Sequence, residues 1–153
     1  MIKKILTRVI AVILLLWVGL FMLNFMSKPA SELGVRDGLL AACPDSPNCV
    51  STRANDKGHA IDAIAFEGPS EEAMKRIEST LGKMPRTKIV TREENYIHAT
   101  ATTLLLRYVD DVEFTFDAEN QQIHFRSASR IGYSDMGANR ARMERFRELF
   151  AAQ

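Results

Sequence analysis

The chain has 153 residues with 20 basic and 19 acidic side chains, and it contains two cysteines and no internal repeat or low-complexity tract. Once the apolar N-terminal residues 1–26 are set aside, 17 basic and 19 acidic residues remain, a net charge of −2. This balance excludes a general electrostatic attraction to nucleic acid or anionic lipid, and the remaining chain, about 120 residues long, suits a single domain.

The first segment is an apolar run, and it carries no charge from Val9 to Met26. As a helix this run spans roughly 27 Å, close to the bilayer's hydrocarbon core of about 30 Å. Lys3, Lys4 and Arg8 precede the run and only Lys28 follows it closely, so the positive-inside rule places the N-terminus in the cytoplasm. We therefore expect a signal anchor that crosses the inner (cytoplasmic) membrane once, with the lipid bilayer as its partner and the domain outside the membrane, which in a Gram-negative cell is the periplasm.

Two other interpretations of this segment stay open. A cleaved signal peptide would leave the domain secreted, although the apolar run is long and only Ser27, Ala30 and Ser31 offer cleavage positions. A helix buried in a soluble core is the other, and so long an uncharged run is unusual there. The expected organisation is a cytoplasmic stub, transmembrane anchor and linker over residues 1–33, followed by one extracytoplasmic domain over residues 34–153.

The stretch ACPDSPNCVS holds both cysteines, Cys43 and Cys49. A metal site needs further ligands at a regular spacing, and a redox pair is normally CxxC. Lipidation at LAAC would require the site to follow the apolar run directly, whereas charged residues intervene. Because an exported chain meets an oxidising environment, the sequence favours a structural disulfide, braced by Pro44 and Pro47 and worth about 2 kcal/mol.

After the cysteine loop the sequence predicts a helix and then strands. Ser70 is placed to cap a helix that ends near Gly82, and apolar residues recur between them at helical spacing. Residues 87–91 and 96–103 are rich in β-branched and aromatic side chains, which is typical of strands.

The clearest element is a hairpin, in which the residues of 112–117 and 122–126 alternate between apolar and polar. A loop centred on residues 118–119 places Glu113 opposite His124. The same register places Asp111 opposite Arg126, on the polar face of the hairpin.

The last element starts near Ser134 and Asp135, either of which can cap, and the stretch from Arg140 to Phe150 is an amphipathic helix. Strand-rich segments flanked by two amphipathic helices predict an α+β fold. We expect an antiparallel sheet of about four strands with the two helices packed on one face, preceded by one N-terminal transmembrane helix.

The segment RSASRIGYSD leaves a strand and runs into a helix start. Backbone amides at such a start, with arginines nearby, can hold a carboxylate or phosphate. The residues predicted to form an anionic-group site are Arg126, Ser127, Ser129, Arg130 and Asp135. The structural alternative is that Arg126 pairs with Asp111, that Arg130 pairs with Asp110 or Asp135, and that the serines form turns and caps.

Catalysis has weaker support in the sequence. GYSDMG departs from the G-x-S-x-G pattern of hydrolases by one residue, and Asp110 and Asp111 point to opposite faces of a strand. Asp111, Glu113 and His124 are the remaining acid/base candidates on one sheet face. The sequence leaves open whether the protein is an enzyme and favours a non-catalytic role, and it shows no cofactor motif.

The motifs CPDSPNCVS, PRTKIV, YIHA, YVDDVEFTFD and RSASRIGYSDMGANRARME occur in this order between about Cys43 and Arg147. In this respect the chain resembles the DUF1499 family, a domain of unknown function found in bacteria, often behind a membrane segment, and in plastids. The resemblance implies a shared fold and a shared site but no activity. The family-like positions are Cys43, Pro44, Ser46, Pro47, Asn48, Cys49, Asp110, Asp111, Glu113, Arg126, Ser127, Ser129, Arg130, Gly132, Asp135, Asn139 and Arg140.

The leading functional hypothesis is a membrane-anchored envelope protein that binds an anionic small molecule or an envelope protein without catalysis. The alternative is an acid/base enzyme that acts on an envelope substrate. A third possibility is a scaffold whose polar clusters only hold the sheet to its surroundings.

Overall fold

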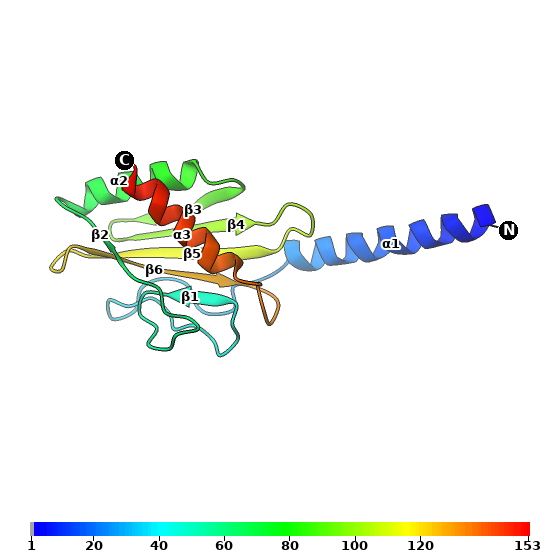
Figure 1. Ribbon diagram of the computed structural model, residues 1–153, viewed down its shortest axis with the longest axis horizontal. Helices are drawn as coiled ribbons and strands as arrows, with labels where there is room; N and C mark the ends of the chain where they lie inside the picture. The colour runs from blue at the N-terminus through cyan, green and yellow to red at the C-terminus, as the bar shows by residue number, and fades with distance from the viewer. Residues whose placement is uncertain (1) are drawn as a thin grey trace.

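The first helix, α1 (Ile2–Phe25), projects away from the rest of the protein in the computed structural model, which describes residues 2–153 (Figure 1). By length and composition α1 could cross a membrane, and its most apolar stretch is not buried against the domain. A signal sequence near an N-terminus can have the same length and apolar composition. The expectation of an apolar N-terminal helix is therefore confirmed.

One antiparallel sheet forms the body of the domain, and its strands follow the order β1-β6-β5-β4-β3, with β2 also paired to β6. The strands are β1 (Cys49–Ser51), β2 (Ile64–Ala65), β3 (Thr87–Glu93), β4 (Tyr96–Thr102), β5 (Val109–Asp117) and β6 (Gln122–Ser129). The sequence predicted about four strands. The two additional ones, β1 and β2, are only three and two residues long and lie in stretches without strand periodicity.

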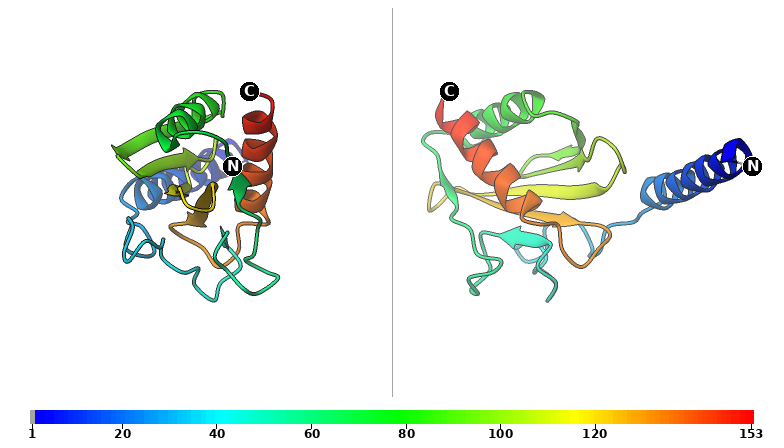
Figure 2. Two further views of the ribbon diagram at one scale, coloured as in Figure 1. Left: turned by 90° about the vertical axis from the view of Figure 1, so that its left-hand side faces the viewer. Right: turned by 45° about the vertical axis from the view of Figure 1, so that its right-hand side comes forward.

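Helices α2 (Ser70–Gly82) and α3 (Ala138–Ala151) cover one face of this sheet (Figures 1 and 2). Phe146 of α3 packs on Phe114 of β5 with ring centroids 4.9 Å apart. Met74 and Ile77 of α2 are fully buried in the same core. The predicted α+β fold, with two helices packed on an antiparallel sheet, is confirmed.

The hairpin between β5 and β6 has the predicted faces but a register two residues away from the predicted one. Asp117 pairs with Gln122, so the loop contains the four residues between them. Within the loop the Asp117 carboxylate accepts a hydrogen bond from the backbone N–H of Asn120, and Gln121 adopts a positive φ of 53°. The predicted centre at residues 118–119 was therefore wrong. A slip of two residues keeps every side chain on its own face.

This change of register alters the polar pairs. Glu113 lies opposite Arg126, and His124 lies opposite Thr115. Asp111 lies opposite Ala128. The predicted pairing of Arg126 with Asp111 is thus replaced by a pairing with Glu113.

The predicted caps also differ from the observed ones. Ser70 does not cap α2, because Pro69 occupies the N-cap position and no side chain bonds there. Helix α3 begins later than predicted, after Gly137. Asp135 still supports its first turn, since its carboxylate accepts a hydrogen bond of 2.7 Å from the backbone N–H of Asn139.

The segment from residue 27 to residue 48, called the strap below, crosses the sheet face opposite the helices (Figure 2). The backbone N–H of Gly34 donates to the Glu113 carboxylate at 2.9 Å, and Arg130 donates to the carbonyl of Ser27 at 2.8 Å. Leu40 of the strap is buried. The strap therefore shields from solvent a sheet face that would otherwise be open.

Candidate functional site

Polar side chains from three neighbouring strands meet beneath the strap. Successive residues of a strand point to opposite faces, so every second residue of β4, β5 and β6 lies on this side. Six titratable residues on this side are buried. They form what we call the polar sheet face: Tyr96, His98, Asp111, Glu113, His124 and Arg126.

Glu113 lies at the centre of the polar sheet face and is fully buried. Its carboxylate accepts hydrogen bonds from the Tyr96 hydroxyl at 2.8 Å, the Gly34 N–H at 2.9 Å and Arg126 Nη1 at 3.2 Å. Two side chains and the strap thus converge on one carboxylate. Charge-assisted hydrogen bonds of this kind offset the cost of removing the charge from water.

Asp111 is the second anchored carboxylate. It accepts a hydrogen bond from His98 Nε2 at 2.8 Å and a two-point contact from Arg130 at 2.8 and 2.9 Å. Burial raises the pKa of Asp111, but the hydrogen bonds from His98 and Arg130 outweigh it and leave the pKa below its ordinary value. Arg130 therefore pairs with Asp111, whereas the structural alternative assigned it to Asp110 or Asp135.

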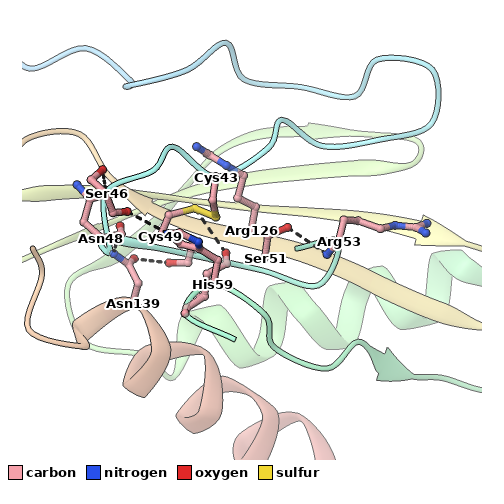
Figure 3. Close-up of a disulfide and its surroundings, with 12 residues drawn as sticks. Cys43, Ser46, Asn48, Cys49, Ser51, Arg53, His59, Arg126 and Asn139 are labelled. Carbon is pink, nitrogen blue, oxygen red and sulfur yellow. Dashed lines mark hydrogen bonds between the residues drawn. A yellow bond between two sulfur atoms is a disulfide. The ribbon is translucent and has the colours of Figure 1, made fainter. Parts of the chain in front are cut away.

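Arg126 has bonding capacity that Glu113 does not use. Its side chain is 1% exposed, and its Nε and Nη2 atoms have no hydrogen-bond partner among residues 2–153. Arg126 lies directly opposite Ser51 of β1, and Cys49, two residues away on the same face, carries the disulfide. Figure 3 shows the Arg126 side chain on the disulfide's side of β6.

A surface hollow of about 360 Å³ opens beside the disulfide. Ser51 and Cys43 line it, and the half-exposed Arg53 stands at its edge. In this hollow, called the disulfide hollow below, Ser51 is the strand partner of the buried Arg126, while Arg126 itself does not line the hollow and the Arg53 guanidinium extends toward Asp117 (Figure 3).

The cysteine loop closes as predicted, with Cys43 bonded to Cys49 and their Cα atoms 5.7 Å apart (Figure 3). The loop is packed beside the segment that follows β6. The Asn48 side-chain amide donates to the carbonyl of Gly132, and the Asn48 carbonyl accepts from the backbone N–H of Ser129 at 3.0 Å. The cysteine loop is therefore held against the segment RSASRIGYSD.

The remaining predicted site residues lie on the helix face of the sheet. Ser127 donates to Asn139 Oδ1 at 2.6 Å, and Asn139 Nδ2 lies 3.0 Å from Ser129 Oγ. Asp135 bonds to the same asparagine from the loop before α3. The sheet itself therefore separates Ser127 and Ser129 from Arg126, and the five predicted residues do not line one cavity.

The acid/base candidates are likewise not gathered in one cleft. Asp111 and Glu113 are held by arginines beneath the strap. His124 instead contacts Thr52, with 3.1 Å between Nδ1 and the hydroxyl oxygen, and lines a separate hollow that neither carboxylate lines. Among the described residues, no group of three or more His, Cys, Asp and Glu side chains is arranged to hold a metal ion.

Four contributors were missed by the sequence interpretation. Tyr96 and His98 alternate with Ile97 in YIHA, a pattern that places both polar side chains on one sheet face. Asn139 and Arg142 are one helical turn apart on α3, and Arg142 binds the buried Asp110. An asparagine inside a helix start carries no comparable signal, because capping and core roles look alike in sequence.

The two remaining histidines give a prediction about pH. Burial lowers the pKa of His124, and Arg53 adds to this effect. The unfolded imidazole takes up a proton near pH 6.5 while the folded one resists it, so the contribution of His124 to stability falls as the pH drops through about 6.5. Unfolding of the His124→Gln variant between about pH 8 and 5 should therefore show a smaller loss of stability than the wild type.

His59 supplies a control of opposite sign. A hydrogen bond to Asp56 raises the pKa of His59, so its contribution is present at low pH and is lost as the pH rises through the raised pKa. The His59→Gln variant should lose more stability on acidification than the wild type does. If His124→Gln and the wild type lost the same amount of stability on acidification, His124 would not be held neutral by its surroundings.

Together these features define a class: a small α+β domain with an antiparallel sheet, a disulfide-closed loop and a buried polar cluster, preceded by an apolar helix. The chain belongs to the DUF1499 family, since the sequence model of the family described as "Protein of unknown function (DUF1499)" matches residues 39–150. The matched part contains the cysteine loop, all six strands, α2 and most of α3. The comparison with curated proteins gives no match. The expected family membership is confirmed, and it brings no activity with it.

Proposed function

We propose that the protein is a single-pass membrane protein whose domain lies outside the cytoplasm, in the periplasm of a Gram-negative cell, and binds a ligand that carries an anionic group. The apolar α1, preceded by Lys3, Lys4 and Arg8, supports the anchor and its orientation. The disulfide between Cys43 and Cys49 supports an oxidising compartment.

The observation that carries the binding proposal is the buried Arg126 with two nitrogens that lack partners. A buried donor without an acceptor costs about 1–3 kcal/mol, and a planar guanidinium fork matches a carboxylate or a phosphate. Arg53 and Ser51 at the disulfide hollow add a second cation and a hydroxyl. Because Arg126 is buried, the ligand reaches it by displacing part of the strap.

The proposed anion site contains fewer of the residues that the sequence predicted for it. Arg130 is committed to Asp111, and Ser127 and Ser129 are committed to Asn139. An acid/base enzyme that uses Asp111, Glu113 and His124 is the alternative proposal. It ranks second, because hydrogen bonds already occupy both carboxylates.

Thermal unfolding of the full chain in detergent, with inorganic phosphate or acetate as the probe, tests the binding proposal. We expect the wild-type Tm to rise with at least one of the two anions. The double variant Glu113→Gln/Arg126→Gln removes the guanidinium without leaving a buried charge alone, and it should lose the rise. Arg53→Ala should weaken the rise.

The matched control is Arg145→Ala, which removes an exposed arginine paired to Glu148 on α3. This variant should keep the full rise in Tm. Absence of stabilisation by both anions in the wild type, or an undiminished rise in both Arg53→Ala and the double variant, would assign Arg126 a structural role only.

A further inference from the structure

Two loops lie at the end of the domain where α1 leaves it (Figures 1 and 2). One is residues 103–108 between β4 and β5, and the other is residues 130–137 between β6 and α3. Asn24 near the end of α1 donates to the carbonyl of Leu106 at 2.6 Å. The link between Arg130 and Ser27 holds the second loop to the chain just beyond α1. Both loops are therefore fixed beside the point where the anchor ends.

These loops gather most of the domain's exposed apolar side chains. Beyond α1 and Met26, eight large apolar residues are exposed, and five of them lie in the two loops. Single exposed apolar residues are ordinary on a soluble surface, whereas a group at one end marks an interaction site. The five residues, called the loop patch below, are Leu104 (69% exposed), Leu105 (72%), Ile131 (42%), Tyr133 (76%) and Met136 (98%).

We propose that the loop patch docks into the interfacial region of the same bilayer that α1 crosses, an inference that rests on the proposed membrane anchor. A second copy of the chain is the other possible occupant, but the bond between Asn24 and Leu106 places the first loop at the level where α1 would leave the hydrocarbon core. Aliphatic side chains together with a tyrosine suit this apolar-to-polar boundary.

The charges beside the loop patch agree with a lipid surface. Lys28 lies three residues beyond the end of α1 and Arg107 lies within the first loop, and both are exposed. Long basic side chains can lie along apolar surface while their charged ends reach lipid phosphates. Docking therefore does not require a basic domain as a whole; it relies on apolar side chains with two local cations.

Fluorescence quenching by brominated lipid tests the proposal on the full chain. Trp17 in α1 is the only tryptophan, so Trp17→Phe gives a background without one. Leu105→Trp and Tyr133→Trp are made in that background, and Val90→Trp on strand β3 serves as the matched exposed control. In zwitterionic phosphatidylcholine vesicles with bromine high on the acyl chains, we expect the two loop tryptophans to be quenched at least twofold more than the one at Val90.

The native Trp17 separates this inference from the proposed anchor. Quenching of Trp17 without quenching at residues 105 and 133 would overturn the docking and leave the anchor in place. Absence of quenching at Trp17 would overturn both. A blue shift at residue 105 that grows with the protein-to-lipid ratio, without quenching, would assign the loop patch to a second copy and overturn the bilayer assignment.

Discussion

Replacing Arg126 by alanine is expected to lower the free energy of unfolding by about 3–5 kcal/mol, because it leaves Glu113 as an uncompensated charge in a buried site. Glu113 has no exposed surface, and Arg126 is the only cation within salt-bridge distance of it among the described residues. The Tyr96 hydroxyl and the Gly34 N–H still bond to the carboxylate but carry no charge. Urea unfolding of the full chain in detergent, followed by circular dichroism, measures the change.

Two further variants separate the ion pair from a general effect of removing an arginine. Arg53→Ala removes a partly exposed cation and should cost less than about 1 kcal/mol, as exposed pairs do. Glu113→Gln/Arg126→Gln removes both charges together and should cost less than Arg126→Ala alone. A loss in Arg126→Ala no larger than that in Arg53→Ala would mean that Glu113 is not held as a buried charge.

This result bears on the two interpretations of the polar sheet face. If the polar sheet face is a scaffold, the pair of Glu113 and Arg126 serves only stability. If it is an anion site, the Nε and Nη2 atoms of Arg126, which Glu113 does not bind, also hold the anion. A double variant that regains stability and loses its response to phosphate and acetate would separate these roles. A double variant that regains stability and is still stabilised by phosphate or acetate would favour the scaffold.

The layers of the fold were predictable because they depend on periodicity. Alternation in 112–117 and 122–126 identified the buried face of the hairpin, and that face is unchanged by the observed register. The register itself depends on the conformation of the loop. A positive φ at Gln121 and the bond from Asn120 to Asp117 lengthen the loop, and neither has a strong sequence signal.

The site was predictable only in part. The alternation that separates Asp110 from Asp111 also separates Arg126 from Ser127, so a pocket containing both could not form on a regular strand. The burial of the polar sheet face depends on the strap. Residues 27–48 contain no regular pattern that would place them over a particular sheet face, and the arrangement is revealed by tertiary contacts such as those of Gly34 with Glu113 and of Ser27 with Arg130.

Replacing Asn139 by alanine is expected to be the second large loss, about 2–4 kcal/mol, because one buried side chain joins three parts of the domain. Its Nδ2 lies within 3.0 Å of the Asn48 carbonyl of the cysteine loop and of Ser129 Oγ on β6. Its Oδ1 accepts from Ser127 and from Arg142 on α3. The same urea measurement tests this loss.

The matched control is Arg140→Ala, the next residue of α3, whose side chain bonds to the carbonyl of Gly58 at the surface. It should change stability by less than about 1 kcal/mol. Because Asn139 binds the carbonyl of Asn48 beside the disulfide, Asn139→Ala should also speed the reduction of the bond between Cys43 and Cys49 by dithiothreitol. Unchanged reduction together with lost stability would show that Asn139 holds α3 to β6 without ordering the cysteine loop. In that case the disulfide hollow takes its shape from the pairing of β1 with β6.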